Sequence, residues 1–182
     1  MEIIKKYSWL IGFAFPLFLR AQDPGEELLS WNNHNKLVWN DYKGSIDPSS
    51  DAAASTATYL GINYNISNSS VSYKISCWFS KNKSWGRYKS EYILSHEQGH
   101  FDITEIFARK LNKMMSDYTF NRNTYQQDLK KIYRDILNEK EKIQNQYDKQ
   151  TDFSRNKEKQ EEWLKKIADM LDDLKEFADY EN

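Results

Sequence analysis

The sequence has little cysteine and little histidine, and it has no large excess of either positive or negative charge. Its 182 residues contain one cysteine, Cys77, which excludes an intramolecular disulfide and a zinc site built on cysteine thiolates. Lys and Arg (26) nearly balance Asp and Glu (27), giving a formal net charge of -1. This leaves no basic surplus to neutralise phosphates, so binding of nucleic acid through a broad basic surface is excluded. The only histidines are His34, His96 and His100.

Long hydrophobic runs are also lacking, apart from one near the start. Residues 7–19 carry no charge, follow Lys5 and Lys6, and precede Ala21 at a plausible cleavage position. This layout is typical of a secretory signal peptide, and the run is too short to span a bilayer comfortably as a permanent helix. We expect residues 1–21 to be a signal peptide, with an uncleaved anchor as the alternative. The protein would then be secreted or periplasmic, without stable membrane insertion after cleavage.

The rest of the chain has the length of a single domain. Residues 22–35 are polar and contain Pro24 and Gly25. They are predicted to form a leader ahead of one domain over residues 36–182.

Two segments alternate apolar and polar residues with a period of two, which predicts β-strands. They are residues 54–66 and 71–80, and a polar turn rich in Ser and Asn separates them. We expect the two strands to pair as an antiparallel β-hairpin. Cys77 falls on the apolar face of the second strand, so we expect a buried and unreactive thiol.

From Glu91 onward, apolar residues recur with the period of an α-helix. The pattern predicts helices over about 91–117, 124–147 and 157–180, the second of them capped by Thr124. The dense charges of the third helix favour a solvent-exposed face. These elements predict an α+β fold in which a small antiparallel sheet (hairpin about 54–80) packs on the first helix and two long helices follow.

The first predicted helix contains the segment His-Glu-Gln-Gly-His at residues 96–100. Residues four apart project from the same face of a helix, so His96 and His100 can bind one Zn²⁺ ion. Glu97 then lies beside the open coordination position, where it can take a proton from water as a general base. Gly99 is costly inside a helix, by about 1 kcal/mol relative to Ala. A close approach of the sheet or of a substrate to the helix would explain it.

A catalytic zinc ion usually has three protein ligands, so one more is expected. If the first two helices pair antiparallel around a break near Asn121, the two histidines lie level with Gln144. Asp148 and Tyr147 are within about 6 Å of that level along the helix axis. We therefore favour Asp148 as the third ligand and Tyr147 as a nearby oxyanion donor. The alternative ligands are Glu141, Glu105, Asp102 and His34.

Three segments of the chain resemble the bacterial DUF922 family, which is described as predicted secreted zinc-dependent proteases. They are residues 36–44 (KLVWNDYKG), residues 92–105 (YILSHEQGHFDITE) and residues 147–151 (YDKQT). The resemblance implies a zincin-like metallopeptidase domain. It implies His96 and His100 as zinc ligands and Glu97 as the catalytic residue. It also points to Tyr147 and Asp148 as part of the site.

One position departs from the family pattern. In that pattern Tyr-Asp-x-x-Thr is followed by x-His, and Phe153 occupies the histidine position here. The third ligand implied by the resemblance is either that histidine, which this chain lacks, or Asp148. Two functions follow. The first is a secreted zinc metallopeptidase acting on a peptide or protein; the second is a non-catalytic envelope protein or binding module that retains the fold.

Three aromatic residues near these motifs allow two interpretations. Trp39 and Tyr42 could line a substrate groove, but aromatic residues beside apolar ones are more often part of the core, and we expect that here. Trp85, in the loop before the first helix, fits either position.

Overall fold

The computed structural model describes residues 25–31 and 36–180. The predicted signal peptide (residues 1–21) and His34 lie outside the described residues. Within the described ranges, no helix is both long enough and apolar enough to cross a membrane.

The predicted hairpin supplies two of the strands of a three-stranded sheet. Strands β3 (Thr58–Ile66) and β4 (Val71–Ser80) pair antiparallel, from Thr58 opposite Phe79 to Ile66 opposite Val71. A short strand, β1 (Leu28–Ser30), adds to the other edge of β4, so the strand order is β1-β4-β3. Cys77 is fully buried on the core side of β4, and burial raises the pKa of its thiol well above the usual value.

The single strand predicted over residues 54–66 is wrong, because the chain divides there into two strands. β2 (Ala54–Ser55) pairs with β5 (Trp85–Gly86) in a separate two-stranded sheet. The division occurs at Ala57, whose backbone N–H donates to the Ser84 hydroxyl while its carbonyl accepts from the Ser80 backbone. The bond to Ser80 extends the hairpin register by one residue, whereas Ser84 immediately precedes β5, the strand with which β2 pairs.

Three helices complete the α+β fold. Helix α1 (Glu91–Ser116) begins where predicted, because the Ser90 side chain accepts a hydrogen bond from the Ile93 backbone and caps it. Helix α2 (Tyr125–Thr151) begins after Thr124, as expected, but the Thr124 hydroxyl bonds the Asp128 carboxylate instead of capping the backbone.

The far ends of α2 and α3 differ from the prediction. α2 runs one turn beyond residue 147 and ends at Asp152, whose backbone is left-handed (φ 48°). α3 (Lys157–Asp173) stops before residue 180, and a 3-10 turn follows it at Lys175–Phe177. Arg109 and Asn112 of α1 supply the physical reason, because their side chains donate to the backbone carbonyls of Leu171 and Phe177. These bonds hold the end of the chain against α1.

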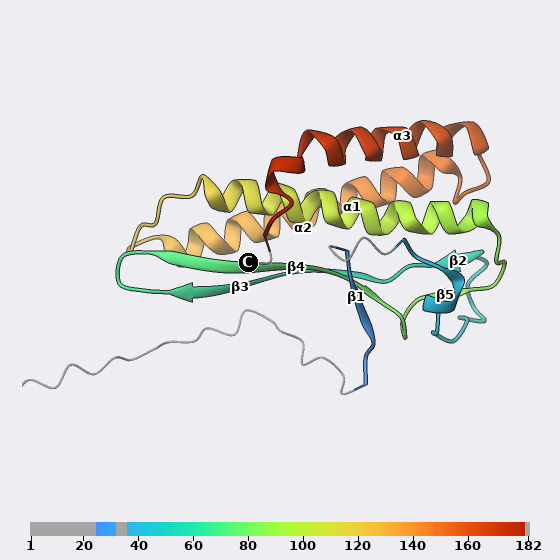
Figure 1. The fold of residues 1–182 in the computed structure, drawn as a ribbon, viewed down its shortest axis with the longest axis horizontal. Coiled ribbons are helices and arrows are strands. Elements are labelled where there is room, and N and C mark those ends of the chain that lie inside the picture. Colours follow the sequence, from blue (N-terminus) through green and yellow to red (C-terminus); the bar gives the residue numbers. More distant parts are fainter. Residues whose placement is uncertain (1–24, 32–35, 181–182) are drawn as a thin grey trace, which may run out of the picture.

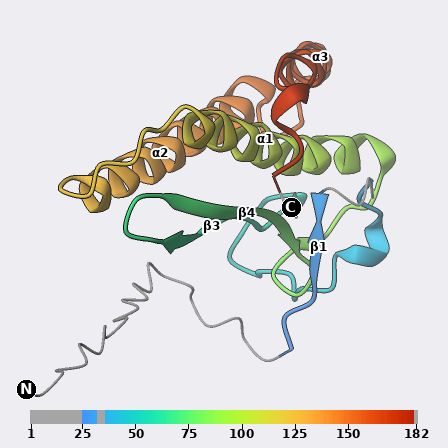
Figure 2. The ribbon, with the colours of Figure 1, turned by 60° about the vertical axis from the view of Figure 1, so that its left-hand side comes forward.

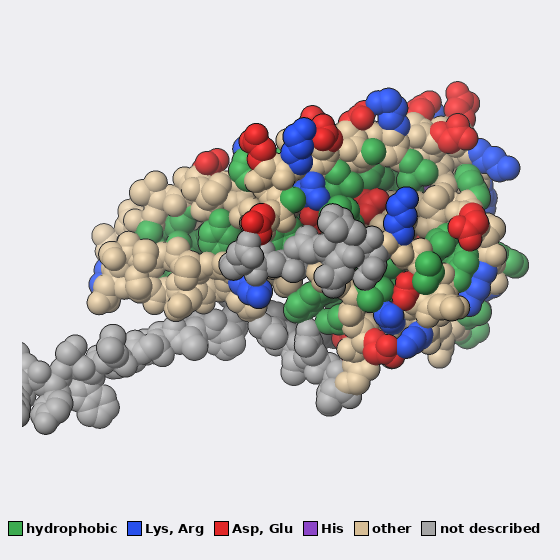
Figure 3. Space-filling view, viewed as in Figure 1, with side chains coloured by type: hydrophobic (Ala, Val, Ile, Leu, Met, Phe, Trp, Pro, Cys, Tyr) green, Lys and Arg blue, Asp and Glu red, His purple; other side chains and the backbone are tan. Residues whose placement is uncertain are grey.

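The helices form a layer on one face of the hairpin (Figures 1 and 2). α1 is the central helix, since it contacts β3, β4 and both other helices. α3 forms the outer edge of this layer, and acidic and basic side chains are interspersed along that edge in Figure 3. The core lies between α1 and the hairpin, where Ile75, Phe79 and Phe107 are fully buried.

Candidate metal centre

The two histidines of the motif lie one turn apart on α1, and both point toward α2. Their Nε2 atoms are 3.3 Å apart. One carboxylate oxygen of Asp148, from α2, lies 3.2 Å from His96 Nε2 and 3.0 Å from His100 Nε2. Three possible metal-ligand atoms therefore meet at one point between the two helices.

The spacing of these three atoms fits a tetrahedral metal ion. Zinc binds imidazole nitrogen and carboxylate oxygen at about 2.0–2.2 Å, so tetrahedral neighbours are separated by roughly 3.3–3.5 Å. The observed separations of 3.0–3.3 Å come close to one face of such a tetrahedron. Two imidazoles and one carboxylate also match a three-ligand catalytic donor set. The residues present therefore fit a zinc ion.

Asp148 reaches this point from inside a helix. The predicted end of this helix at residue 147 is wrong, because α2 continues to Thr151 and includes Asp148. The antiparallel pairing of α1 and α2 by itself brings the carboxylate level with the histidines. Of the proposed third ligands that lie within the described residues, Asp148 is the one that the structure brings together with His96 and His100.

Two of the alternative ligands on α1 have other partners. The Glu105 carboxylate is fully buried, receives a hydrogen bond from Arg109 at 2.8 Å, and is also bonded by the Tyr180 hydroxyl. Asp102 accepts hydrogen bonds from the Trp31 indole and the Gln98 amide, each at 2.8 Å. Glu105 therefore does not orient a metal ligand, and both carboxylates serve the packing of α1.

Glu141 lies nearer to the centre but is not part of it. It lines the same pocket as the histidines, is exposed, and accepts a long hydrogen bond of 3.4 Å from the Asn145 amide.

Gln144 is a site residue that the sequence did not single out. Its side-chain nitrogen donates to the His100 carbonyl at 2.9 Å and to the Thr104 hydroxyl at 3.3 Å, which fixes the orientation of the amide. Its oxygen then faces His100 Nδ1 at 2.5 Å and accepts a hydrogen bond from the N–H there. With its proton kept on Nδ1 by this contact, His100 can bind a metal ion through Nε2 once the Nε2 proton is released. The sequence did contain a clue, because antiparallel pairing of the two helices places Gln144 at the same height as the two histidines.

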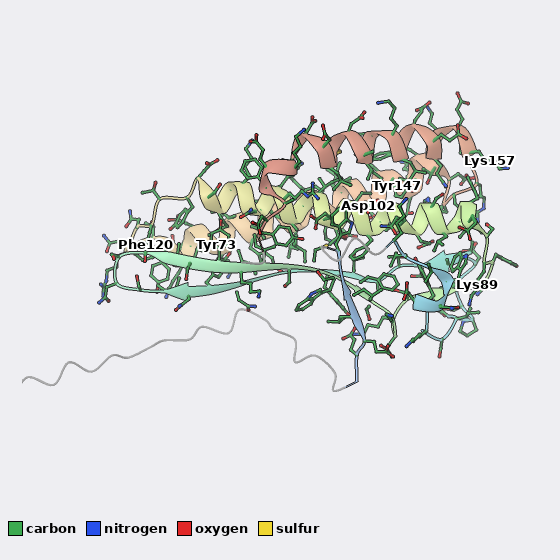
Figure 4. The ribbon with its side chains drawn as sticks, viewed as in Figure 1. Tyr73, Lys89, Asp102, Phe120, Tyr147 and Lys157 are labelled. Carbon is green, nitrogen blue, oxygen red and sulfur yellow. The ribbon has the colours of Figure 1, made fainter. Side chains whose placement is uncertain are left out.

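Tyr147 packs against His96 and holds it in position. Its ring stacks on the imidazole with centroids 4.5 Å apart, and its hydroxyl donates to the His96 carbonyl at 3.2 Å. The side chain is fully buried within the helical layer (Figure 4). A hydroxyl held in this way is not placed to donate to an oxyanion, so the geometry gives Tyr147 a positioning role instead.

The close contact of Tyr147 with helix α1 explains the glycine at position 99. A Cβ at this position would lie 2.5 Å from the Tyr147 hydroxyl oxygen and 2.8 Å from the ring carbon that carries it. The expected close approach therefore exists, but it comes from α2 and not from the sheet or a substrate.

Within the triad, the Asp148 carboxylate and the histidines each stabilise the charged form of the other. Burial alone would raise the pKa of the Asp148 carboxyl, but hydrogen bonds from His100 and His96 outweigh it and hold that pKa well below its usual range. Burial alone would lower the pKa of His100, whereas the Asp148 carboxylate raises it above the usual value. The carboxylate is therefore ionised and ready to bind a cation.

The triad opens into a pocket of about 560 Å³ between α1, α2 and the segment that carries β2. One wall consists of small side chains over residues 52–58. Glu97 lines this pocket, is 4% exposed, and forms no hydrogen bond or ion pair with any residue that the structure describes. A buried carboxylate without a protein partner, one residue from a metal triad, is suited to exchange protons with a bound molecule.

The aromatic residues near the motifs divide between core and pocket. Tyr42 is buried, with its hydroxyl 2.9 Å from that of Thr56, and belongs to the core as expected. Half-buried Trp39 packs against Gly86. Trp85 lines the pocket.

Comparison with known proteins identifies a family but no characterised relative. No curated protein and no solved structure matches the chain. A family model described as a bacterial protein of unknown function (DUF922) matches residues 43–155, which include the triad, Glu97, Gln144 and the small-residue wall of the pocket. Because this match covers more than half of the chain, the protein belongs to the DUF922 family.

Proposed function

We propose that this protein is a secreted zinc-dependent peptidase with a zincin-like arrangement of its active-site helix. The observation that carries the proposal is the pairing of a His96–His100–Asp148 triad with an unpartnered Glu97 carboxylate in one pocket. A metal ion and a general base are the two parts that hydrolysis of a peptide bond requires. The predicted signal peptide supports an exported enzyme.

Each residue of the site has a defined task in this reaction. His96, His100 and Asp148 would hold a zinc ion, which would supply polarisation of a substrate carbonyl and would lower the pKa of a water molecule to about 7. Glu97 takes a proton from the attacking water and returns it to the leaving amine. Gln144 and Tyr147 keep the two imidazoles in the orientation in which their Nε2 atoms converge.

The pocket is suited to an extended peptide. Small side chains over residues 52–58 let a peptide backbone approach the wall opposite α2 closely. We infer that the substrate adds in an extended conformation along this wall, with its scissile carbonyl toward the triad. The substrate class is therefore a peptide or an extended segment of a protein.

A non-catalytic binding module is the second candidate, and Phe153 favours it. This residue lines the pocket and is 56% exposed, at the position where the family pattern has histidine. An apolar ring there could bind a partner without chemistry. The two candidates differ in whether Glu97 matters, since a binding module has no need of a general base.

The test uses the mature chain, purified without chelator. We expect about one zinc ion per chain by elemental analysis, and cleavage of an unstructured protein that stops with chelator and returns with zinc. Glu97→Gln should retain the zinc and lower the cleavage rate by about 10²–10⁴-fold. The exposed Glu161 of α3 provides the matched control, and Glu161→Gln should cleave at the wild-type rate.

Zinc binding with equal cleavage by wild type and Glu97→Gln would contradict the mechanism. Zinc binding with no cleavage of any substrate would favour the binding module. A chain that binds no zinc would contradict the metal site itself.

A further inference from the structure

Lys140 is the one Lys or Arg among the described residues that line the metal pocket. It lies on α2, eight residues before Asp148, which places its backbone about 12 Å from that ligand along the helix axis at 1.5 Å per residue. Its side chain is half-buried. It forms no hydrogen bond or ion pair with any residue in the described ranges, although eleven other Lys or Arg side chains do form ion pairs there.

The acidic groups that share the pocket are mostly engaged elsewhere. Asp148 is bonded by the two histidines, and Asp47 accepts hydrogen bonds from the backbone and hydroxyl of Ser49. Glu141, next to Lys140 in the chain, is exposed and bonded to Asn145. Glu97 belongs to the chemistry at the centre. The Lys140 ammonium is therefore a pocket cation without a protein counter-ion.

Burial of an unpaired ammonium is unfavourable, and the environment of Lys140 reflects this. Burial lowers the pKa of its amine, while the charge of Glu141 partly counteracts the shift. Removal of such a group from water is offset when an anion binds beside it. The pocket therefore suits a ligand that reaches the metal site at one end and carries a carboxylate about 12 Å away, beside Lys140.

We propose that Lys140 is the subsite for a carboxylate of the substrate, placed about three residues from the bond that is cleaved. An extended peptide advances about 3.3 Å per residue, so about 12 Å corresponds to three or four residues, and the lysine stem shortens the gap. The carboxylate belongs to an acidic side chain or to the free C-terminus of the peptide. The position of the cleaved bond rests on the proposed function; the carboxylate subsite rests on Lys140 alone.

The experiment measures binding and not turnover. The mature Glu97→Gln chain, in the metal state in which it purifies, is titrated by calorimetry with alanine-rich octapeptides. One series moves a single Glu along the peptide, with Gln at the same position as its control. A second series compares a free C-terminal carboxylate with a C-terminal amide. We expect one position of Glu, or the free C-terminus, to strengthen binding about tenfold, the effect of one charged hydrogen bond.

Variants of two lysines on the same helix separate the subsite from general charge. Lys140→Met should abolish the tenfold preference. Lys142→Met removes an exposed lysine two residues away, on a different side of α2, and should preserve it. Lys140→Glu should reverse it, so that a peptide with Lys at the selected position binds better than one with Glu. Thermal unfolding of each variant confirms that it is folded.

A preference that survives in Lys140→Met, or equal binding of all peptides, would overturn the subsite and leave the peptidase proposal intact. A Lys140-dependent preference without zinc-dependent cleavage by the unmutated chain would keep the subsite and overturn the peptidase. Failure of every peptide to bind would overturn both.

Discussion

Helix α1 carries two buried clusters of ionisable side chains, about two turns apart, that are balanced in opposite ways. The cluster near its start consists of His96, Glu97 and His100, with Asp148 of α2. We call it the open cluster. The cluster near its middle joins Glu105 and Arg109, and we call it the closed cluster.

The closed cluster finds all its partners within the protein. The Glu105 carboxylate is bonded by Arg109 and by the Tyr180 hydroxyl, near the end of the chain. Arg109 also donates to the Leu171 carbonyl and lies over the Trp31 ring, 5.1 Å from its centroid. Burial raises the pKa of Glu105, and these bonds counteract the shift. The cluster ties both ends of the domain to α1.

The open cluster has the same kinds of side chain but an incomplete set of partners. Glu97 has no hydrogen bond among the described residues, and the buried His96 Nδ1 atom likewise finds none there. Three possible metal-ligand atoms, from His96, His100 and Asp148, converge on one point. Buried charge alone does not distinguish a structural cluster from a functional one; the distinguishing feature is whether the protein itself balances the charge.

The largest expected difference between the clusters is in stability. Arg109→Met leaves the buried Glu105 carboxylate without its cationic partner, and should lower the free energy of unfolding by about 3–5 kcal/mol. Glu97→Gln removes no protein contact and should change it by less than about 0.5 kcal/mol. Urea denaturation of both variants with chelator present checks this. Equal losses of stability in the two variants would remove the distinction between closed and open clusters.

A smaller effect, on zinc affinity, is expected from Gln144, the residue that orients His100 in the open cluster. Gln144→Leu removes the acceptor of His100 Nδ1 and should weaken zinc binding about 10- to 100-fold. Competition with a chelating dye measures the affinity. The exposed Gln127 of the same helix gives the control, since Gln127→Leu should bind zinc as the wild type does. Unchanged affinity in Gln144→Leu would mean that the helix pairing alone orients the imidazole.

The sequence could predict the elements and one half of the open cluster. The hairpin follows from a strict period of two, and the placing of His96 and His100 follows from a spacing of four on one helix. Both are local patterns. The antiparallel pairing of the first two helices also predicts Asp148, although α2 continues beyond the predicted end to Thr151.

The features that escaped prediction depend on contacts between distant segments. The division of residues 54–66 into β2 and β3 needs Ser84, and the end of α3 needs Arg109 and Asn112 of α1. The supporting role of Gln144 needs the exact register of two helices. None of these leaves a periodic signal in the sequence, because each is made by one side chain reaching one backbone group.

The smallest expected effect concerns the contact between α1 and α2 beneath the open cluster. Gly99→Ala gains about 1 kcal/mol of helix propensity. Its Cβ, however, would lie 2.5 Å from the Tyr147 hydroxyl oxygen, on a ring that is fully buried and stacked on His96. Overpacking of this kind costs about 1–3 kcal/mol, so a net loss of about 1 kcal/mol is expected.

Replacement of the tyrosine tests whether that ring is the cause. In a Tyr147→Leu background the obstacle is removed, and Gly99→Ala should then stabilise the protein by up to about 1 kcal/mol. Urea denaturation of the four proteins in the cycle, with chelator present, gives the coupling between the two positions. If Gly99→Ala lowers the free energy of unfolding equally in both backgrounds, a residue other than Tyr147 must be what requires glycine at this position. A change of sign would show that close contact of α1 with Tyr147, and not helix propensity, selects glycine between the two histidines.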